Sequence, residues 1–352
     1  MKKEKAFIIL SDLDNTFLPM DSKTMESFVN FAKDIKEKHD INVKFCPVTG
    51  RPPQFTSGVM HSFKGAFERK GLQDVVEIGG ADQGGVLVDY KYPYKSKMLA
   101  RENCKELIEK IQETLFSSKI GKYFEKDEDT RAVSVFMLND KYLKKWSQEK
   151  ITDIVKEAKE YIEDKFEGEV KVTPWKHFLE ATPKEVGKDK AASEIFSHYQ
   201  RQYDIVGMTY SGDAPNDMKA IKFLTKFSEI PGISSHVFLP SNAVEDVTDP
   251  KIEQWKERLG DKAKGRVIHV ADEKYFEGVL KLMKQKYEEG KLFGEGSSIK
   301  RTTDDLNVHY GKSNKEQVEV KSEKSKDDSF LNKMKKFEKG EAVKNNNKGF
   351  TL

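Results

Sequence analysis

The sequence predicts an α/β fold whose core is a doubly wound, mostly parallel sheet. Short apolar runs that are typical of strands alternate with helical patterns up to about residue 90, and again from about residue 184. The first run, Phe7–Leu10, is entirely apolar, and residues 23–38 repeat apolar positions at a spacing near 3.6. Strands that alternate with helices favour a parallel sheet with helices on both faces.

The segment between the two halves of this pattern, residues 91–183, does not alternate in the same way. It contains helical patterns at 102–116 and 143–166, and strand-like runs at 132–138 and 169–174. Such an order favours an α+β unit inserted into the α/β core. We therefore expect residues 1–90 and 184–290 to form the core, and residues 91–183 to form a separate unit.

The last stretch of the chain, residues 291–352, is rich in Lys, Glu, Ser and Asn and shows little periodicity. It carries 14 Lys/Arg and 10 Asp/Glu, a net charge of +4, whereas the whole chain has 62 and 59, a net charge of +3. Such a segment buries too little apolar surface to offset the entropy of ordering, so we expect a largely disordered tail. One amphipathic stretch within it, Phe330–Phe337, could bind a protein or an anionic membrane.

Composition excludes several classes of protein. No apolar run approaches the roughly 20 residues of a membrane span, and the first run is too short for a signal peptide. Only two cysteines occur, Cys46 and Cys104, so no disulfide framework is expected and the cytoplasm is the expected location. The lysines of the tail are diluted by acids and lack interleaved aromatic residues, which argues against nucleic-acid binding.

Two carboxylates, Asp12 and Asp14, directly follow the first apolar run, and Thr16 comes two residues later. In open α/β sheets, ligands bind at the carboxyl ends of the strands. Two acids this close suit a reaction that needs a nucleophile, an acid/base and a divalent cation. The pair alone would also fit a helix N-cap or a turn, so the rest of the chain decides.

Three further polar motifs follow in order, two of them after strand-like runs and one at the start of a helical pattern. They are Val48-Thr49-Gly50-Arg51, Lys188 and Gly212-Asp213-Ala214-Pro215-Asn216-Asp217. A DxDxT, a Thr, a Lys and a GDxxxD in this order resemble the four motifs of the haloacid dehalogenase superfamily of phosphohydrolases. The resemblance covers roughly residues 5–290.

The inserted unit resembles the large cap that some members carry between their second and third motifs. These members include Cof-like sugar-phosphate phosphatases, sucrose-phosphate and mannosylphosphoglycerate phosphatases, and phosphomannomutase. Cof-like members usually have Asn-Gly-Ala after the third strand, where this chain has Gly79-Gly80-Ala81 and so lacks a side-chain amide. Their lysine motif commonly reads Lys-Gly, and here it is Lys188-Asp189. Both differences leave the chemistry intact but bear on the usual substrate contacts.

The resemblance assigns a chemical role to the carboxylates. Asp12 is expected to attack phosphorus, and Asp14 to protonate the leaving oxygen and later to activate the attacking water. The expected cofactor is Mg²⁺, a hard cation that prefers oxygen ligands. Its expected ligands are the carboxylates of Asp12, Asp213 and Asp217 and the backbone carbonyl of Asp14.

The phosphate group and the rest of the substrate need contacts of their own. Those expected for the phosphate are the Thr49 hydroxyl, the Gly50 backbone N–H, the Lys188 ammonium and Asn216. For Arg51 we expect an ion pair that supports the site. Substrate selection is expected in the inserted unit, near Phe136, Trp175 and His177.

Together these roles predict a Mg²⁺-dependent phosphomonoester hydrolase that acts through an aspartyl-phosphate. Its partner would be a small phosphorylated metabolite, foremost a sugar phosphate, over which the cap closes. A phosphosugar mutase or a phosphoprotein phosphatase would use the same chemistry. Outside enzymes, the alternative is a binding module that uses the basic tail, but the presence of every motif residue argues against a vestigial site.

Overall fold

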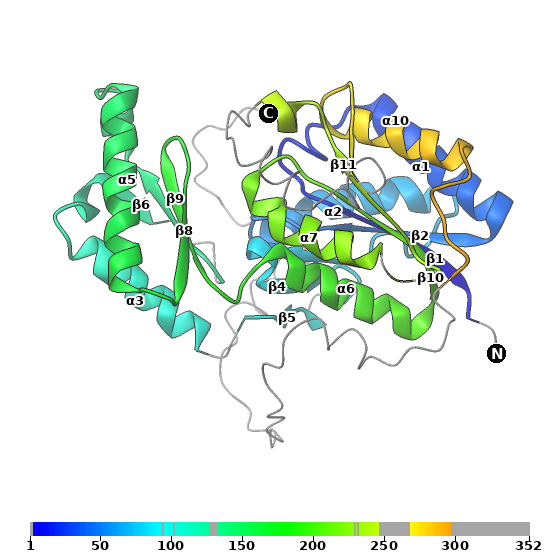
Figure 1. Ribbon diagram of the computed structural model, residues 1–352, viewed down its shortest axis with the longest axis horizontal. Coiled ribbons are helices and arrows are strands. Elements are labelled where there is room, and N and C mark those ends of the chain that lie inside the picture. Colours follow the sequence, from blue (N-terminus) through cyan, green and yellow to red (C-terminus); the bar gives the residue numbers. More distant parts are fainter. Residues whose placement is uncertain are drawn as a thin grey trace, which may run out of the picture.

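In the computed structural model of the protein, the described residues are 3–92, 95–100, 103–126, 132–228, 230, 232–245 and 268–296. A five-stranded sheet lies at the centre of the larger part of the molecule (Figure 1). Each pair of neighbouring strands in it is parallel. Side by side, the strands are β12 (Ile268–Val270), β11 (Ser234–Leu239), β10 (Asp204–Ser211), β1 (Lys5–Ser11) and β2 (Ile41–Pro47).

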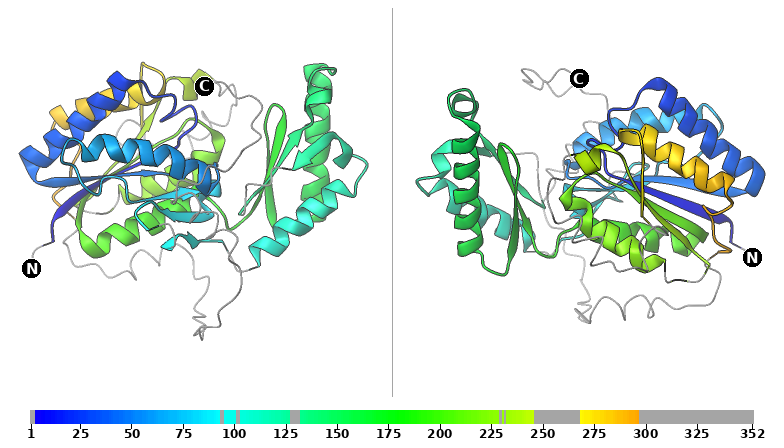
Figure 2. Two further views of the ribbon diagram at one scale, coloured as in Figure 1. Left: turned by 180° about the vertical axis from the view of Figure 1, so that it is seen from behind. Right: turned by 45° about the horizontal axis from the view of Figure 1, so that its top comes forward.

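Helices cover both faces of this sheet (Figures 1 and 2). One face packs against α1 (Ser22–His39), α2 (Pro53–Glu68) and α10 (Tyr275–Glu288). The other packs against α6 (Lys188–Gln202) and α7 (Met218–Phe227), and a short helix, α8 (Asn242–Glu245), follows β11. This arrangement confirms the predicted α/β fold with a mostly parallel sheet.

The burial of β1 explains why its sequence is apolar without alternation. Phe7 and Ile9 pack into the hydrophobic cluster formed with α1, α2 and α10. Ile8 and Leu10 pack into the opposite cluster, which includes α6 and α7. A central strand that is buried on both faces has no position left for a polar side chain.

A small antiparallel sheet continues from the edge strand β2. It consists of β3 (Ile78–Ala81), β4 (Val86–Asp89) and β5 (Lys97–Met98), with a single 3₁₀ turn, η1 (Asp82–Gly84), between the first two. Its parallel contact with the core is the bridge between Val48 and Gly80.

The inserted segment has a sheet and a hydrophobic cluster of its own. Its antiparallel strands, side by side, are β6 (Phe124–Lys126), β7 (Ser134–Leu138), β9 (Phe178–Pro183) and β8 (Val170–Pro174). Its helices are α3 (Cys104–Phe116), α4 (Asp140–Leu143), α5 (Gln148–Lys165) and the single turn η3 (Gly121–Tyr123). The domain limits at residues 90/91 and 183/184 stay a prediction.

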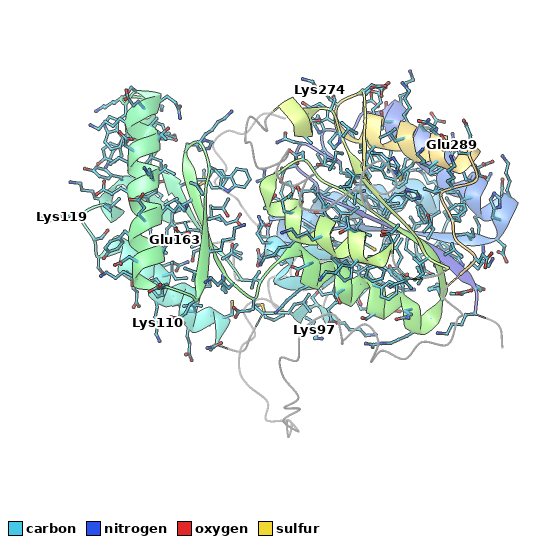
Figure 3. All side chains as sticks on the ribbon, viewed as in Figure 1. Lys97, Lys110, Lys119, Glu163, Lys274 and Glu289 are labelled. Carbon is cyan, nitrogen blue, oxygen red and sulfur yellow. The ribbon has the colours of Figure 1, made fainter. Side chains whose placement is uncertain are left out.

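The two faces of this second sheet have different surroundings. Leu179 and Ala181 point into the cluster formed with α3 and α5. Because successive side chains of a strand alternate, Phe178, Glu180 and Thr182 lie on the opposite face, which is turned toward the core in Figures 1 and 2. In Figure 3, charged side chains such as the labelled Lys119 lie on the side of this unit that is turned away from the core.

Two predicted elements differ in the structure. The single helix expected over 143–166 is divided, because α5 begins at Gln148 with Ser147 as its N-cap, whose hydroxyl accepts a hydrogen bond from the Lys150 N–H. The first residues of the predicted tail belong to the core, since Leu292 is buried and the Gly294 N–H donates to the Val206 carbonyl.

The remainder of the predicted tail, with the amphipathic stretch at 330–337, lies outside the described residues. Across the helices that the structure describes, none combines the length and the apolar character needed to span a membrane.

Candidate active site

The carboxyl ends of three neighbouring strands place the predicted motifs side by side. Ser11 at the end of β1 is in register with Ser211 of β10 and with Pro47 of β2. The residues that follow these three strands are therefore neighbours at one edge of the sheet, as expected for an open α/β fold.

Asp12 is nearly buried, with 5% of its surface exposed. One carboxylate oxygen accepts a hydrogen bond from the Leu13 N–H (2.8 Å), and the other lies 3.0 Å from Lys188 Nζ. Burial raises the pKa of Asp12 well above its ordinary value; Lys188 opposes this rise, while Asp217 and Asp213 add to it. The negative charge of Asp12 thus depends on nearby cations.

Lys188 is the first residue of α6, and its ammonium group lies between two carboxylates. It donates to Asp217 Oδ1 (2.7 Å) and pairs with Asp12, and its side chain is fully buried. Burial alone would lower the pKa of Lys188, but the two carboxylates outweigh burial and hold the pKa above its ordinary value. Lys188 is therefore a fixed positive charge beside Asp12.

Asp217 accepts four hydrogen bonds. Its Oδ1 accepts from Lys188 and from the Tyr210 hydroxyl, and its Oδ2 accepts from the backbone N–H groups of Asp213 and Ala214. A carboxylate has about four acceptor positions. Asp217 thereby holds the loop after β10 against the first turn of α6.

Asp213 completes an acidic group with Asp12 and Asp217, whose nearest oxygens all lie within 4.8 Å of one another. Asp213 Oδ1 accepts a hydrogen bond from the Thr16 hydroxyl (3.0 Å), which ties the first motif to the fourth. Burial, and then the charge of Asp217, raises the pKa of Asp213 to about 7.

The charges of this group do not balance within the described residues. The three carboxylates and the ammonium of Lys188 have a net charge of −2 when all are ionised. Two of the three carboxylates are buried, so such an excess is costly unless a cation compensates it. Clustered carboxylate oxygens are the ligands that a hard divalent cation prefers, so the residues fit the predicted metal.

Asp14 lies apart from the buried carboxylates. It forms a two-pronged ion pair with Arg51, whose Nε and Nη2 each donate at 2.9 Å to a different oxygen of Asp14. The side chains of both residues are partly exposed, at 42% and 51%. This ion pair is the one that the sequence predicts for Arg51.

The second motif is held tightly by its surroundings. Thr49 is buried, its backbone N–H donates to the Gly80 carbonyl, and its hydroxyl accepts from the Arg51 N–H (3.1 Å). At Gly50, a Cβ atom would lie 2.4 Å from Nε2 of Gln83, so the amide of Gln83 rests directly on this glycine.

Gln83 is a residue that the sequence analysis missed. Its Nε2 donates to Glu180 Oε2 (2.8 Å) and its Oε1 accepts from Asn216 Nδ2 (3.3 Å). The chain was expected to lack a side-chain amide after the third strand, because Gly79-Gly80-Ala81 was compared with Asn-Gly-Ala. The structure supplies an amide four residues after Gly79, from Gln83 in η1, whose backbone has a positive φ of 55°.

Glu180, on β9 of the inserted unit, was also missed. It is 6% exposed, and burial raises its pKa, while hydrogen bonds from Gln83 and Thr182 oppose the rise. The signal in the sequence was a single acid inside the apolar run of 178–181, but it could not show which surface that acid would face.

The three residues near which substrate selection is expected have different positions. Phe136 is fully buried in the cluster of the inserted unit, so its own side chain points away from the face that is turned toward the core. Trp175 stacks on Phe178 at 5.5 Å between ring centroids, close to the turn between β8 and β9. His177 is exposed beside them, and its ring makes an edge contact with the ring of Phe178.

Residues 9–226 match the family model of the haloacid dehalogenase-like hydrolases, and this span is more than half of the chain. The chain belongs to this family. Membership confirms the predicted superfamily and the prediction that the protein is an enzyme, a hydrolase. No curated protein sequence matches the chain.

Solved structures are similar to this protein at low sequence identity. The C-terminal domain of the trehalose synthase regulatory protein from Candida albicans has a TM-score of 0.51 and 11% identity, over 80% of this chain and 93% of that one. Sucrose-phosphatase from Synechocystis sp. PCC6803 has a TM-score of 0.46 and 15% identity, over 81% and 98%. A haloacid dehalogenase-like hydrolase from Bacteroides thetaiotaomicron has 0.46 and 14%, over 80% and 99%. The first of these likenesses shows the fold alone.

Proposed function

We propose that this hydrolase is a Mg²⁺-dependent phosphatase that cleaves small phosphomonoesters through a phosphoryl group on Asp12. The observation that carries the proposal is the group of three clustered carboxylates, two of them buried, beside the buried ammonium of Lys188. When all four groups are ionised, the excess is two negative charges. Phosphoryl transfer depends mainly on positioning and on neutralising charge. A fixed nucleophile, a fixed ammonium and a place for a divalent cation meet those needs.

The metal would be held by Asp12, by Asp213 and by the backbone carbonyl of Asp14, with Asp217 beside them. When bound, Mg²⁺ supplies positive charge that neutralises the carboxylates and the phosphate oxygens. The hydrogen bonds of Asp217 already engage both of its oxygens, so its main contribution would be to hold Lys188 and the loop of Asp213.

In the first step, Asp12 attacks phosphorus, the bond from phosphorus to the ester oxygen breaks, and Asp14 donates a proton to that oxygen. In the second step, Asp14 takes a proton from a water molecule whose oxygen attacks phosphorus, and the bond to Asp12 breaks. Lys188 neutralises the charge that develops on the phosphoryl oxygens. Arg51 would position Asp14 for both proton transfers.

The inserted unit would act as the cap. Its sheet face, on which Phe178 and Glu180 lie, is turned toward the core, where it could exclude water from the phosphorylated enzyme. A face with both apolar and hydrogen-bonding side chains suits an organic moiety that carries hydroxyl groups, and a sugar phosphate is therefore the substrate that we propose. Residence in the cytoplasm stays a prediction.

The test is release of inorganic phosphate from a panel of phosphomonoesters, with Mg²⁺ or with a chelator, by the wild type and by Asp12→Asn. We expect turnover that needs Mg²⁺ and falls by at least about 10³-fold in the variant, because an amide cannot replace the nucleophile. Equal thermal midpoints of unfolding would show that the variant is folded. Turnover by Asp12→Asn at the rate of the wild type would refute the proposal, and bisphosphate-dependent isomerisation without phosphate release would favour a mutase.

A further inference from the structure

A chain of three side chains links the inserted unit to the core beside the candidate active site. It runs from Glu180 on β9, through Gln83 in η1, to Asn216 in the fourth motif within η4 (Pro215–Asp217). The middle residue, Gln83, rests on Gly50, whose backbone N–H is expected from the sequence to bind phosphate. The chain therefore passes along the border between the phosphate site and the cap.

Glu180 is the charged end of this chain. Its Oε2 accepts from Gln83 and its Oε1 accepts from the Thr182 hydroxyl (3.2 Å). Among the residues that the structure describes, no Lys or Arg forms an ion pair with this carboxylate. A buried carboxylate without an ion-pair partner needs hydrogen-bond donors, and the amide of Gln83 is one of the two donors that the described residues supply.

The middle of the chain has little freedom. The backbone N–H of Gln83 donates to the Thr49 carbonyl (3.0 Å), and the preceding N–H, of Asp82, donates to the Arg51 carbonyl (2.9 Å). The side chain of Gln83 is itself 5% exposed. The residue is thus fastened to the second motif and cannot turn away from Glu180 without losing buried hydrogen bonds.

Hydrogen-bond chemistry sets which group of each amide donates and which accepts along this series of side chains. An ionised carboxylate only accepts, so Gln83 must present its NH₂ group to Glu180 and its oxygen to Asn216. Asn216 must then present its own NH₂ group to Gln83. The remaining atom, Asn216 Oδ1, is buried and accepts no hydrogen bond from the described residues. A buried acceptor without a donor is unfavourable, so a donor from a bound ligand would be favourable there.

We propose that Glu180 and Gln83 are positioning residues that orient the Asn216 amide so that its oxygen accepts a hydrogen bond from a hydroxyl group of the substrate. The inference rests on the proposed phosphatase function only for this last contact. The direction of the chain is a property of the folded protein and can be tested by itself. Through this chain, the cap unit determines how a side chain of the core motif is presented to the organic part of a phosphomonoester.

The first test exchanges the two ends of the cap–core hydrogen bond. Gln83→Glu alone places two carboxylates against each other, and we expect its thermal midpoint to fall by about 5 °C or more. The double variant Gln83→Glu, Glu180→Gln keeps the net charge and restores a donor for the carboxylate, while Asn216 still donates to residue 83. We expect it to recover most of the lost midpoint. A double variant that is no more stable than Gln83→Glu would overturn the proposal.

The second test separates binding from chemistry. Glu180→Gln no longer fixes the orientation of the Gln83 and Asn216 amides. We therefore expect KM for a hydroxylated substrate to rise about fivefold, with kcat nearly unchanged. For para-nitrophenyl phosphate, which has no hydroxyl group, KM should be the same in the variant and in the wild type. The matched control is Glu169→Gln, an exposed acid of the same unit. Equal effects on both substrates would overturn the contact with Asn216. A wild type that hydrolyses nothing would refute the proposed function but leave the exchange of residues 83 and 180 as a valid test.

Discussion

The two surfaces that meet at the candidate site are built differently. On the core side, Asp12, Lys188 and Asp217 are nearly or fully buried, and each is held by ion pairs and hydrogen bonds to other core residues. On the cap side, the face of β7 and β9 combines half-buried apolar side chains, such as Met137 and Phe178, with Glu180.

This difference separates two tasks. Charges that act on a phosphoryl group must be placed to within a hydrogen-bond distance, and a crowded cluster with every partner fixed achieves that. A surface that selects an organic moiety mainly needs shape and a few polar contacts. Disturbing the core side should therefore affect both stability and turnover, whereas disturbing the cap side should mainly affect substrate binding.

The largest effect is expected at Lys188. In Lys188→Met, two buried carboxylates lose their shared cation, and breaking a buried pair in this way typically costs about 3–5 kcal/mol of unfolding free energy. Phosphatase turnover should fall by about 10²–10³-fold, since the ammonium that neutralises the phosphoryl oxygens is absent. Chemical denaturation and steady-state kinetics measure the two effects.

The control for this variant is Lys222→Met, which removes an exposed ammonium from α7. It should be within about 0.5 kcal/mol of the wild type. If Lys188→Met were equally harmless, the account of a tightly coupled charge cluster on the core side would be wrong.

A smaller effect is expected at Asp213, where the linkage of charge to pH can be measured. The folded state raises the pKa of this carboxyl from 3.8 to about 7, so the folded state binds its proton more tightly than the unfolded chain does. Without metal, the stability that Asp213 contributes is therefore lost as pH rises from about 4 to about 7. Asp213→Asn should remove this part of the pH dependence of the thermal midpoint.

Metal binding should restore the stability that the ionised Asp213 costs the folded state. At pH 7.5, Mg²⁺ should raise the thermal midpoint of the wild type, because the ion binds the folded state only. The rise should be much smaller in Asp213→Asn. Equal rises in the two proteins would show that the buried carboxylates do not form the metal site.

The smallest effect is expected on the cap side. Phe178→Ala removes an aromatic ring from the face that is turned toward the core, and we expect KM to rise by less than about tenfold with little change in kcat. The matched control is Phe116→Ala on α3, where the ring is 38% exposed. A large loss of kcat in Phe178→Ala would contradict the division of tasks between the two surfaces.

The core residues of the site could be predicted from the sequence because local patterns place them. An apolar strand that ends in Asp12, and a strand-like run that ends before Asp213, each show their position relative to a strand end, and parallel strands bring these ends together. The order of the motifs then favoured one superfamily. The fold class and the group of Asp12, Lys188, Asp213 and Asp217 follow from this reasoning.

The contacts of Gln83 and Glu180 could not be obtained in this way. They lie 97 residues apart in the chain and meet across the border between two units, so no local pattern joins them. Gln83 reaches the site only because its backbone adopts a positive φ, which is uncommon for this residue type. Phe136, near which substrate selection is expected, itself points into the interior of the cap unit, because side chains alternate along β7.

The central claim is that a phosphoryl group is carried by Asp12. The most direct measurement is rapid acid quenching during turnover with Mg²⁺, followed by mass spectrometry of the peptide that contains Asp12. The account predicts a phosphoryl group on this peptide that is removed by hydroxylamine, as an acyl-phosphate is, and that is absent from Asp12→Asn. Turnover with a phosphoryl group on another residue would contradict the account.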